Sequence, residues 1–143
     1  MRLPPTLALT VCIAMTAPMP NATAPPAKIY KILTPDQWTE LSRDGQTQGS
    51  PLDQADGFIH FSTRAQLRGT LDKHFAGAGP LMLAAIPIAT LAHLDLRWEA
   101  ARGGELFPHL YDVLRRDAIS NHWPLHEDAQ GRYALPGEME TDT

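Results

Sequence analysis

Histidines and a glutamate lie beside aromatic residues in this sequence, and such side chains can transfer protons or bind ligands. His60 shares one face of a predicted strand at 58–62 with Phe58 and Ser62, because side chains alternate along a strand. One interpretation makes His60 a core or edge residue bonded to backbone. The other places His60 and Ser62 on the floor of a cleft, where imidazole and hydroxyl bind the sugar or amide of a ligand. Ser62 and Thr63 are equally well explained as helix caps.

Glu99 follows Trp98 at the end of an alternating segment. It is either the last member of a solvated face or a carboxylate at a cleft rim, where it would bind a hydroxyl or stabilise developing positive charge. The segment 107–111 (Phe-Pro-His-Leu-Tyr) favours a bend whose rings fill the core, with His109 bonded to a backbone carbonyl. Lys31 either extends along a sheet edge, which the sequence favours, or points into a polar cleft.

Motifs of well-known enzyme classes are absent from the sequence. It contains no P-loop, no G-x-G-x-x-G, no G-x-S-x-G and no H-E-x-x-H. His122 and His126 are four residues apart, but Pro124 between them disfavours the helix that would align them. A three-histidine metal site built from His60, His109 and a third histidine has no support from spacing. We therefore predict no metal site.

The sequence marks clearly where the helices and strands that position these side chains begin. Two capping boxes predict helices after Thr34 and Thr63, Ser50 starts a helical turn, and Leu81 begins an apolar run typical of a buried central strand. Extended segments are predicted at 29–33, 58–62, 81–86, 94–99, 106–114 and 133–135, and 115–122 is ambiguous between strand and short helix. Strands outnumber helices without regular βαβ alternation. The pattern indicates the α+β class.

Composition indicates one domain at 28–136, preceded by a different segment at 1–27 and followed by a polar tail at 137–143. The chain has 143 residues with a formal charge of −4. A mildly acidic domain without a basic patch argues against nucleic acid as a partner. The only cysteine, Cys12, excludes a disulfide framework or a thiol nucleophile in this domain.

Residues 1–27 hold 6 of the 13 prolines and an apolar run too short to span a bilayer, so no stable membrane insertion is expected. The segment is either unstructured, or part of an over-extended gene start, or an export signal. We expect a cytoplasmic protein, or an exported one if the segment is a signal peptide.

Several blocks together form a recognisable pattern: Ile-Tyr-Lys-Ile at 29–32, Trp38, Gly-Phe-Ile-His-Phe-Ser at 57–62, Trp-Glu at 98–99 and Leu-Phe-Pro-His-Leu-Tyr at 106–111. Over about residues 28–136 the sequence resembles the bacterial family called domain of unknown function 952. This resemblance implies an ADP-ribosyltransferase-like fold, in which two small, mostly antiparallel sheets and a few short helices surround a cleft. In active relatives of that fold the cleft holds NAD.

The resemblance also implies roles for individual residues. Lys31, Ser62, His109 and Tyr111 would contact the ligand, and Glu99 and His60 would be the catalytic candidates. Lys31 stands where the family usually has histidine, and Asp112 where it usually has glycine. We therefore predict a domain that binds a small nucleotide-like ligand, with NAD as its ligand or substrate. The alternative is an ADP-ribosyltransferase or NAD glycohydrolase that cleaves the nicotinamide N-glycosidic bond.

Overall fold

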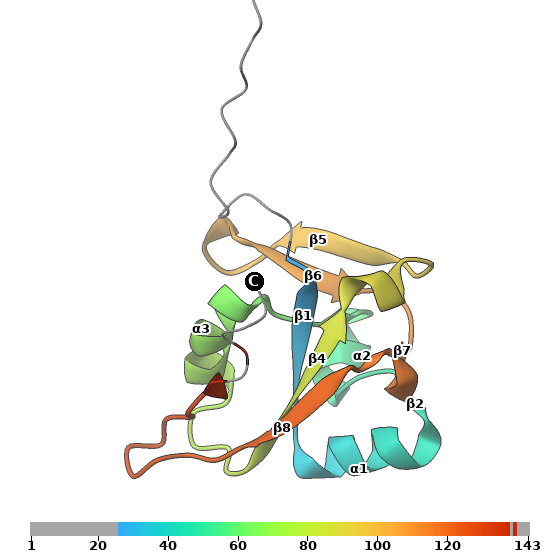
Figure 1. Cartoon of the computed structure of the whole chain (residues 1–143). Helices are drawn as coiled ribbons and strands as arrows, with labels where there is room; N and C mark the ends of the chain where they lie inside the picture. Colours follow the sequence, from blue (N-terminus) through green and yellow to red (C-terminus); the bar gives the residue numbers. More distant parts are fainter. Residues whose placement is uncertain (1–25, 138, 140–143) are drawn as a thin grey trace, which may run out of the picture.

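The computed structural model describes residues 26–137 and Met139 (Figure 1). The helices are α1 (Pro35–Asp44), α2 (Pro51–Asp56) and α3 (Arg64–His74), and three short 3-10 segments are η2 (Ile88–Leu91), η3 (Arg102–Gly104) and η4 (Arg116–Ala118). The strands are β1 (Lys28–Leu33), β2 (Gln46–Thr47), β3 (Ile59–His60), β4 (Leu81–Pro87), β5 (Leu96–Ala100), β6 (Leu106–Leu110), β7 (Leu114–Arg115) and β8 (Asn121–Leu125). The α+β class is confirmed.

Antiparallel pairing builds two three-stranded sheets, in the orders β1-β4-β8 and β3-β6-β5, and a two-stranded sheet β2-β7. The nearly continuous apolar segment at 81–87 occupies the centre of the first sheet, as its sequence predicts. The expected arrangement of small antiparallel sheets with a few helices is therefore confirmed.

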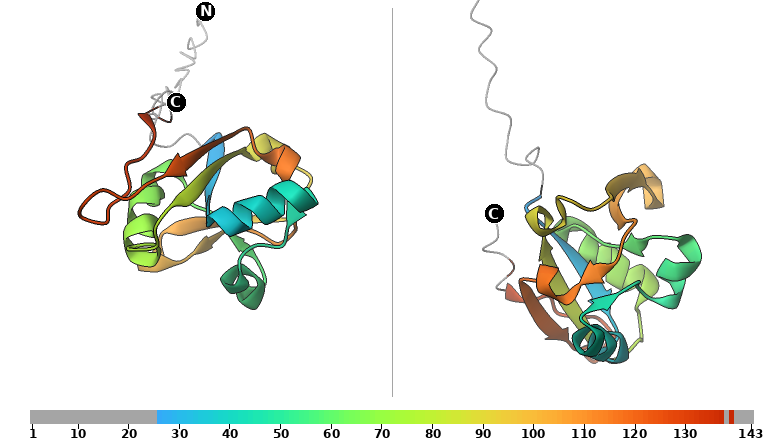
Figure 2. Two further views of the ribbon diagram at one scale, coloured as in Figure 1. Left: turned by 90° about the horizontal axis from the view of Figure 1, so that it is seen from below. Right: turned by 90° about the vertical axis from the view of Figure 1, so that its right-hand side faces the viewer.

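Two helices cover opposite faces of the first sheet, and each face has its own core. Leu41 of α1 packs with Ile29 and Ile86 on one face, whereas Leu67 and Leu71 of α3 pack in a core with the other face. The two views in Figure 2 show α1 and α3 on different sides of these strands. Met139, which lies within the segment expected to be a polar tail, is buried in the α3 core.

The capping predictions agree with the structure. The Thr34–Gln37 and Thr63–Gln66 capping boxes start α1 and α3, and Gly45 ends α1 with a φ of 76°. The helical turn that Ser50 starts is α2. Local side-chain to backbone bonding is readable from sequence, and it fixes the start of each helix.

A backbone bridge joins β1 to the chain just after β3. Tyr30 of β1 and Ser62 exchange two backbone hydrogen bonds of 2.8 and 2.9 Å. Beyond this bridge β1 has no further strand partner on that side within residues 26–137, because β1 is the edge strand of its sheet. The space next to this edge is lined by side chains of α2, α3 and β3, and the candidate site lies there.

Some predicted elements differ from the structure. The ambiguous segment 115–122 contains η4 and then enters β8, where Pro124 is tolerated because β8 is an edge strand. The expected strand at 133–135 is reduced to a single bridge between Tyr133 and Glu127. Residues 1–25, 138 and 140–143, on which the N-terminal and C-terminal predictions fall, lie outside the described residues. In the part that the structure describes, no helix is long and apolar enough to cross a membrane.

Candidate functional site

The described chain has a pocket of about 650 Å³, which we call the main pocket. Its walls come from β1 (Tyr30, Lys31 and Ile32), from α2, from the segment His60–Ser62, and from the C-terminal end of α3, and His109 of β6 lies on the same lining. The volume is within the range of about 300–1,000 Å³ found for small-molecule sites.

Asp53 is at the centre of a charged network beside this pocket. Only 2% of it is exposed, yet its carboxylate accepts a hydrogen bond from Lys31 Nζ at 2.7 Å and from the Ser50 backbone N–H at 2.8 Å. His60 approaches the other oxygen, with Nδ1 at 2.6 Å and the backbone N–H at 3.2 Å. Asp53 therefore ties α2 to β1 and β3.

Electrostatics keeps Asp53 ionised. Burial opposes the charged form, but the hydrogen bond from His60 and the positive charge of Lys31 outweigh it and hold the pKa of Asp53 well below its usual range. Burial lowers the pKa of Lys31, while the adjacent Asp53 carboxylate opposes this effect. Lys31 also donates to the carbonyl oxygen of His60 at 3.0 Å. The exposed sheet edge expected for Lys31 is therefore wrong, since its ammonium group needs this buried partner.

The local sequence explains why Asp53 adopts this position. Ser50 and Asp53 form a capping box, in which the Ser50 side chain accepts from the Asp53 N–H and Asp53 accepts from the Ser50 N–H. Gly49 has a φ of 95°, and a Cβ there would lie 2.5 Å from Cβ of Asp53. Only glycine allows the chain to approach so closely in this conformation.

A second histidine–carboxylate contact lies on the neighbouring strands. Nδ1 of His109 is 3.0 Å from Oε1 of Glu99, and the Tyr111 hydroxyl donates to the same oxygen at 2.7 Å. The hydrogen bond from Tyr111, followed by that from His109, lowers the pKa of Glu99, and the same contact with Glu99 raises the pKa of Tyr111. The guanidinium carbon of Arg97 lies 4.0 Å from the centre of the Tyr111 ring.

Strand alternation places these groups on one face of the β3-β6-β5 sheet. His60 is directly opposite His109 in the register, and their ring centres are 5.4 Å apart. The Phe58 ring packs between the clusters, with its centre 4.6 Å from His60 and 4.1 Å from His109. The two histidine–carboxylate pairs therefore form one connected surface.

The structure brings together most of the residues singled out by sequence. Lys31, His60, Ser62 and His109 line the main pocket. Glu99 and Tyr111 are not on the lining of this pocket. Glu99 contacts the lining residue His109, and the Tyr111 hydroxyl donates to the same Glu99 oxygen.

The structure adds detail at four residues that the sequence-based interpretations singled out. The ring of His60 bonds side chains rather than backbone, and His109 bonds Glu99 rather than a carbonyl. The Ser62 hydroxyl contacts Thr70 at 2.9 Å, so the helix cap is Thr63 alone. Asp112 is exposed, accepts from the Val113 N–H at 2.7 Å and is not on the pocket lining.

Sequence reasoning missed Asp53 as a functional candidate. It treated the residue as part of a helix start, which is correct but incomplete. One signal was present: Asp53 lies in the first turn of the helix that Ser50 starts, seven residues before His60. Asp56, whose Oδ2 lies 3.0 Å from Nε2 of His60, was missed for the same reason.

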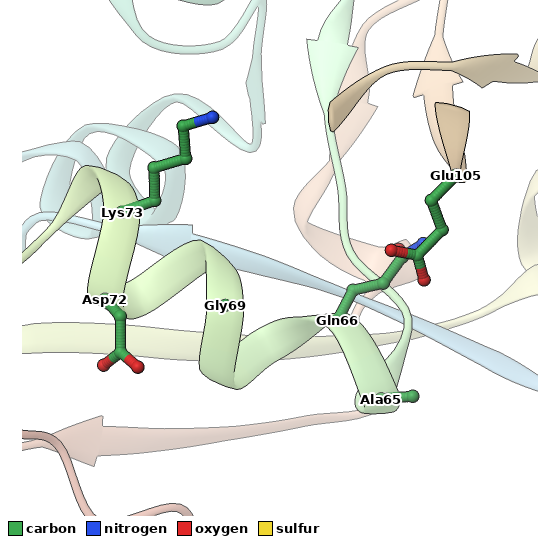
Figure 3. A pocket seen from close by; sticks show the side chains of 6 residues that line it. All are labelled: Ala65, Gln66, Gly69, Asp72, Lys73 and Glu105. Carbon is green, nitrogen blue, oxygen red and sulfur yellow. The ribbon is translucent and has the colours of Figure 1, made fainter. Parts of the chain in front are cut away.

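A shallower hollow of about 430 Å³ lies on the outer side of α3, between Ala65, Asp72 and Glu105 (Figure 3). Lys73 points away from the carboxylates of Asp72 and Glu105 in this view, and it also lines the main pocket. In contrast to the main pocket, this hollow contains no buried charge. Among residues 26–137 and Met139, no group of three or more His, Cys, Asp or Glu side chains is arranged to hold a metal ion.

Comparison with known proteins places this chain among relatives of known structure. It is similar to the crystal structure of protein CC0527 from Caulobacter crescentus, with 40% identity, a TM-score of 0.74, and coverage of 79% of this chain and 98% of that one. The solution NMR structure of CC0527 matches with 42% identity, a TM-score of 0.66, and coverage of 74% and 90%. No curated protein matches the chain significantly. The model of the family described as protein of unknown function (DUF952) matches residues 32–122, and the chain belongs to this family.

Proposed function

We propose that this protein binds a small nucleotide-like ligand in the main pocket, on an ADP-ribosyltransferase-like scaffold, and that NAD is a ligand of this class. The observation that carries the proposal is the combination in one pocket of ligand-sized volume, a fixed pair of histidines and aromatic rings. Small-molecule sites typically combine an apolar lining with a few fixed polar groups.

The charges around the main pocket suit a ligand with phosphate groups. Lys31 and His60 contact the carboxylates of Asp53 and Asp56, which limits their repulsion of an anion. Lys73 makes no ion pair with any residue that the structure describes, and it adds positive charge at the C-terminal end of α3. A phosphate near Lys73 would leave the sugar and base to contact the histidines and the rings of Phe75 and Phe107.

Titration of the full-length chain with NAD tests this proposal. We expect calorimetric heat of binding and a rise in melting temperature, because a ligand that binds only the native state stabilises it. His109→Leu is expected to abolish both. The matched control is His122→Leu, because His122 lies against Trp38 and away from the main pocket. Absence of binding at millimolar NAD, or equal loss in both variants, would contradict the proposal.

Cleavage of NAD is the second candidate, and the ionised state of Glu99 favours it. In that reaction the bond between nicotinamide nitrogen and ribose breaks, nicotinamide leaves with the bonding electrons, and a water molecule or acceptor bonds to the ribose carbon and loses a proton to solvent. A carboxylate near the pocket would stabilise the positive charge that develops on the ribose. Release of nicotinamide by wild type that is lost in Glu99→Gln would support catalysis, whereas binding without release would support a binding domain.

A further inference from the structure

The two pocket histidines are held in the same way by different parts of the fold. Both are on adjacent strands, directly opposite each other, and both contact Phe58. In each ring, Nδ1 faces a carboxylate, at 2.6 Å from Asp53 for His60 and at 3.0 Å from Glu99 for His109. The rings therefore have defined orientations before any ligand arrives.

Chemistry assigns a proton to Nδ1 in both rings. An ionised carboxylate only accepts hydrogen bonds, so the nitrogen facing it must donate. Asp53 is also bonded by Lys31 and Ser50, and Glu99 by Tyr111, and these donors keep both carboxylates in the accepting form. A carboxylate that fixes the tautomer of a functional histidine is a common arrangement in enzymes.

The other nitrogen, Nε2, differs between the two rings. Within the described residues, no buried side-chain nitrogen or oxygen lacks a hydrogen-bond partner. His109 lines the main pocket with 7% of its side chain exposed, and Nε2 is the ring nitrogen that Glu99 does not engage. Nε2 of His60 instead lies 3.0 Å from Oδ2 of Asp56, a residue at the pocket rim whose side chain is 40% exposed.

We propose that Asp53 and Glu99 are positioning residues that hold His60 and His109 with the proton on Nδ1, so that both Nε2 atoms address one ligand in the main pocket. Nε2 of His109 accepts a hydrogen bond from a ligand hydroxyl. Nε2 of His60 faces the Asp56 carboxylate, so by the same rule it also carries a proton, and it donates to a ligand oxygen in the place that Asp56 occupies. The fitting ligand carries a free hydroxyl beside an acceptor oxygen, as a ribose phosphate does. The identity of this ligand class rests on the proposed function, but the positioning itself does not.

Side-chain nitrogen NMR of the full-length chain tests the positioning without any ligand. Long-range correlations between ring protons and nitrogens distinguish a protonated from an unprotonated nitrogen in each ring. At about pH 8 we expect the wild-type His109 to carry its proton on Nδ1. In Glu99→Ala this pattern should be lost, whereas Glu105→Ala, which removes an exposed glutamate outside the main pocket, should retain it.

The same NMR measurement applies to His60, in double variants that remove the charges of Lys31 and Asp53 together. Removing Asp53 alone leaves the Lys31 ammonium buried without its partner, so Lys31→Met/Asp53→Leu is compared with Lys31→Met/Asp53→Asn. The asparagine oxygen still accepts a hydrogen bond and should preserve the proton on Nδ1, and leucine should not. If neither double variant folds, the wild-type spectrum decides for His60.

Two results would overturn the inference. One is a wild-type spectrum with the proton of His109 or His60 absent from Nδ1, and the other is an unchanged pattern in folded Glu99→Ala. Titration with NAD is a separate test of the ligand. Glu99→Ala should bind NAD about tenfold more weakly than Glu105→Ala does, as expected for loss of one hydrogen bond. If NAD does not bind at all, the proposed function fails while the NMR result still decides the positioning.

Discussion

The two histidine–carboxylate pairs are inverted with respect to burial. In the first pair the carboxylate is buried and the histidine is partly open, with 2% of Asp53 and 34% of the His60 side chain exposed. In the second the histidine is buried and the carboxylate is partly open, with 7% of His109 and 37% of Glu99 exposed. The same contact therefore has different consequences in the two places.

The difference teaches which pair the fold depends on. Asp53 connects α2, β1 and β3 through several hydrogen bonds, so its carboxylate is part of the framework. Among the described residues, the Glu99 carboxylate bonds only the side chains of His109 in β6 and of Tyr111 directly after it, and 37% of the Glu99 side chain is exposed. We expect changes at Asp53 to affect stability and site together, and changes at Glu99 to affect the site alone.

Removal of Asp53 should have the largest effect. Asp53→Ala leaves the Lys31 ammonium buried without its counter-charge, and breaking a buried pair in this way typically costs about 3–5 kcal/mol. Urea denaturation of wild type and variant measures the free energy of unfolding. A loss below about 1 kcal/mol would show that the network contributes little to the fold.

The double variant Lys31→Met/Asp53→Leu serves as the control for this experiment. It removes both charges and replaces them with apolar side chains, which is often neutral or stabilising for a buried pair. We therefore expect it to be more stable than Asp53→Ala. A double variant as unstable as the single one would mean that the hydrogen bonds to Ser50 and His60, rather than the charge of Lys31, account for the loss.

Acid should weaken the first pair before the rest of the fold. The pKa of Asp53 is lowered by folding, so its contribution is fully present well above the unfolded value of about 3.9 and declines as pH falls from about 5 toward the folded pKa. We expect a loss on the order of 1 kcal/mol between about pH 6 and pH 3, because only the unfolded state takes up a proton in that range. Urea denaturation over this range should give a flatter profile for Lys31→Met/Asp53→Leu, and equal profiles would contradict the assignment.

Gly49 allows the effect of close approach to Asp53 to be isolated. Gly49 and Gly77 both have positive φ, at 95° and 73°, but an added Cβ meets Asp53 at Gly49 and nothing within 4 Å at Gly77. Both alanine variants carry backbone strain of about 1 kcal/mol, and Gly49→Ala should cost about 1 kcal/mol more because Asp53 must move. Equal losses of unfolding free energy would show that Asp53 tolerates the displacement.

Much of the fold was predictable from the sequence because it is encoded locally. The Thr34 and Thr63 capping boxes and the apolar run from Leu81 specify their elements through neighbouring residues. The strand β8 was predicted only in part, as the ambiguous segment 115–122, because its pairing comes from β4, which is distant in the sequence. The strand expected at 133–135 is instead a single bridge from Tyr133 to Glu127, six residues earlier.

The candidate site was predictable only in part, for the same reason. Alternation placed His60 and Ser62 on one face, and the family resemblance pointed to Lys31, His109 and Glu99. The partners were not readable, since Lys31 and Asp53 are 22 residues apart and joined by folding alone. Burial of Lys31 follows from Asp53, so without that partner the sequence favoured an exposed edge.

The smallest expected effect on stability is at Glu99, and this variant tests the difference between the buried and the open carboxylate most directly. Glu99→Gln keeps an oxygen that accepts from Tyr111 and His109 and removes a charge that solvent already screens. We expect its urea midpoint to match that of wild type within error, whereas Asp53→Asn should unfold at clearly lower urea. If the two variants lose similar stability, the open carboxylate supports the fold as the buried one does, and burial does not separate the two pairs. If only Asp53→Asn loses stability, a change in ligand binding by Glu99→Gln can be attributed to His109 and its surroundings, because the fold is intact.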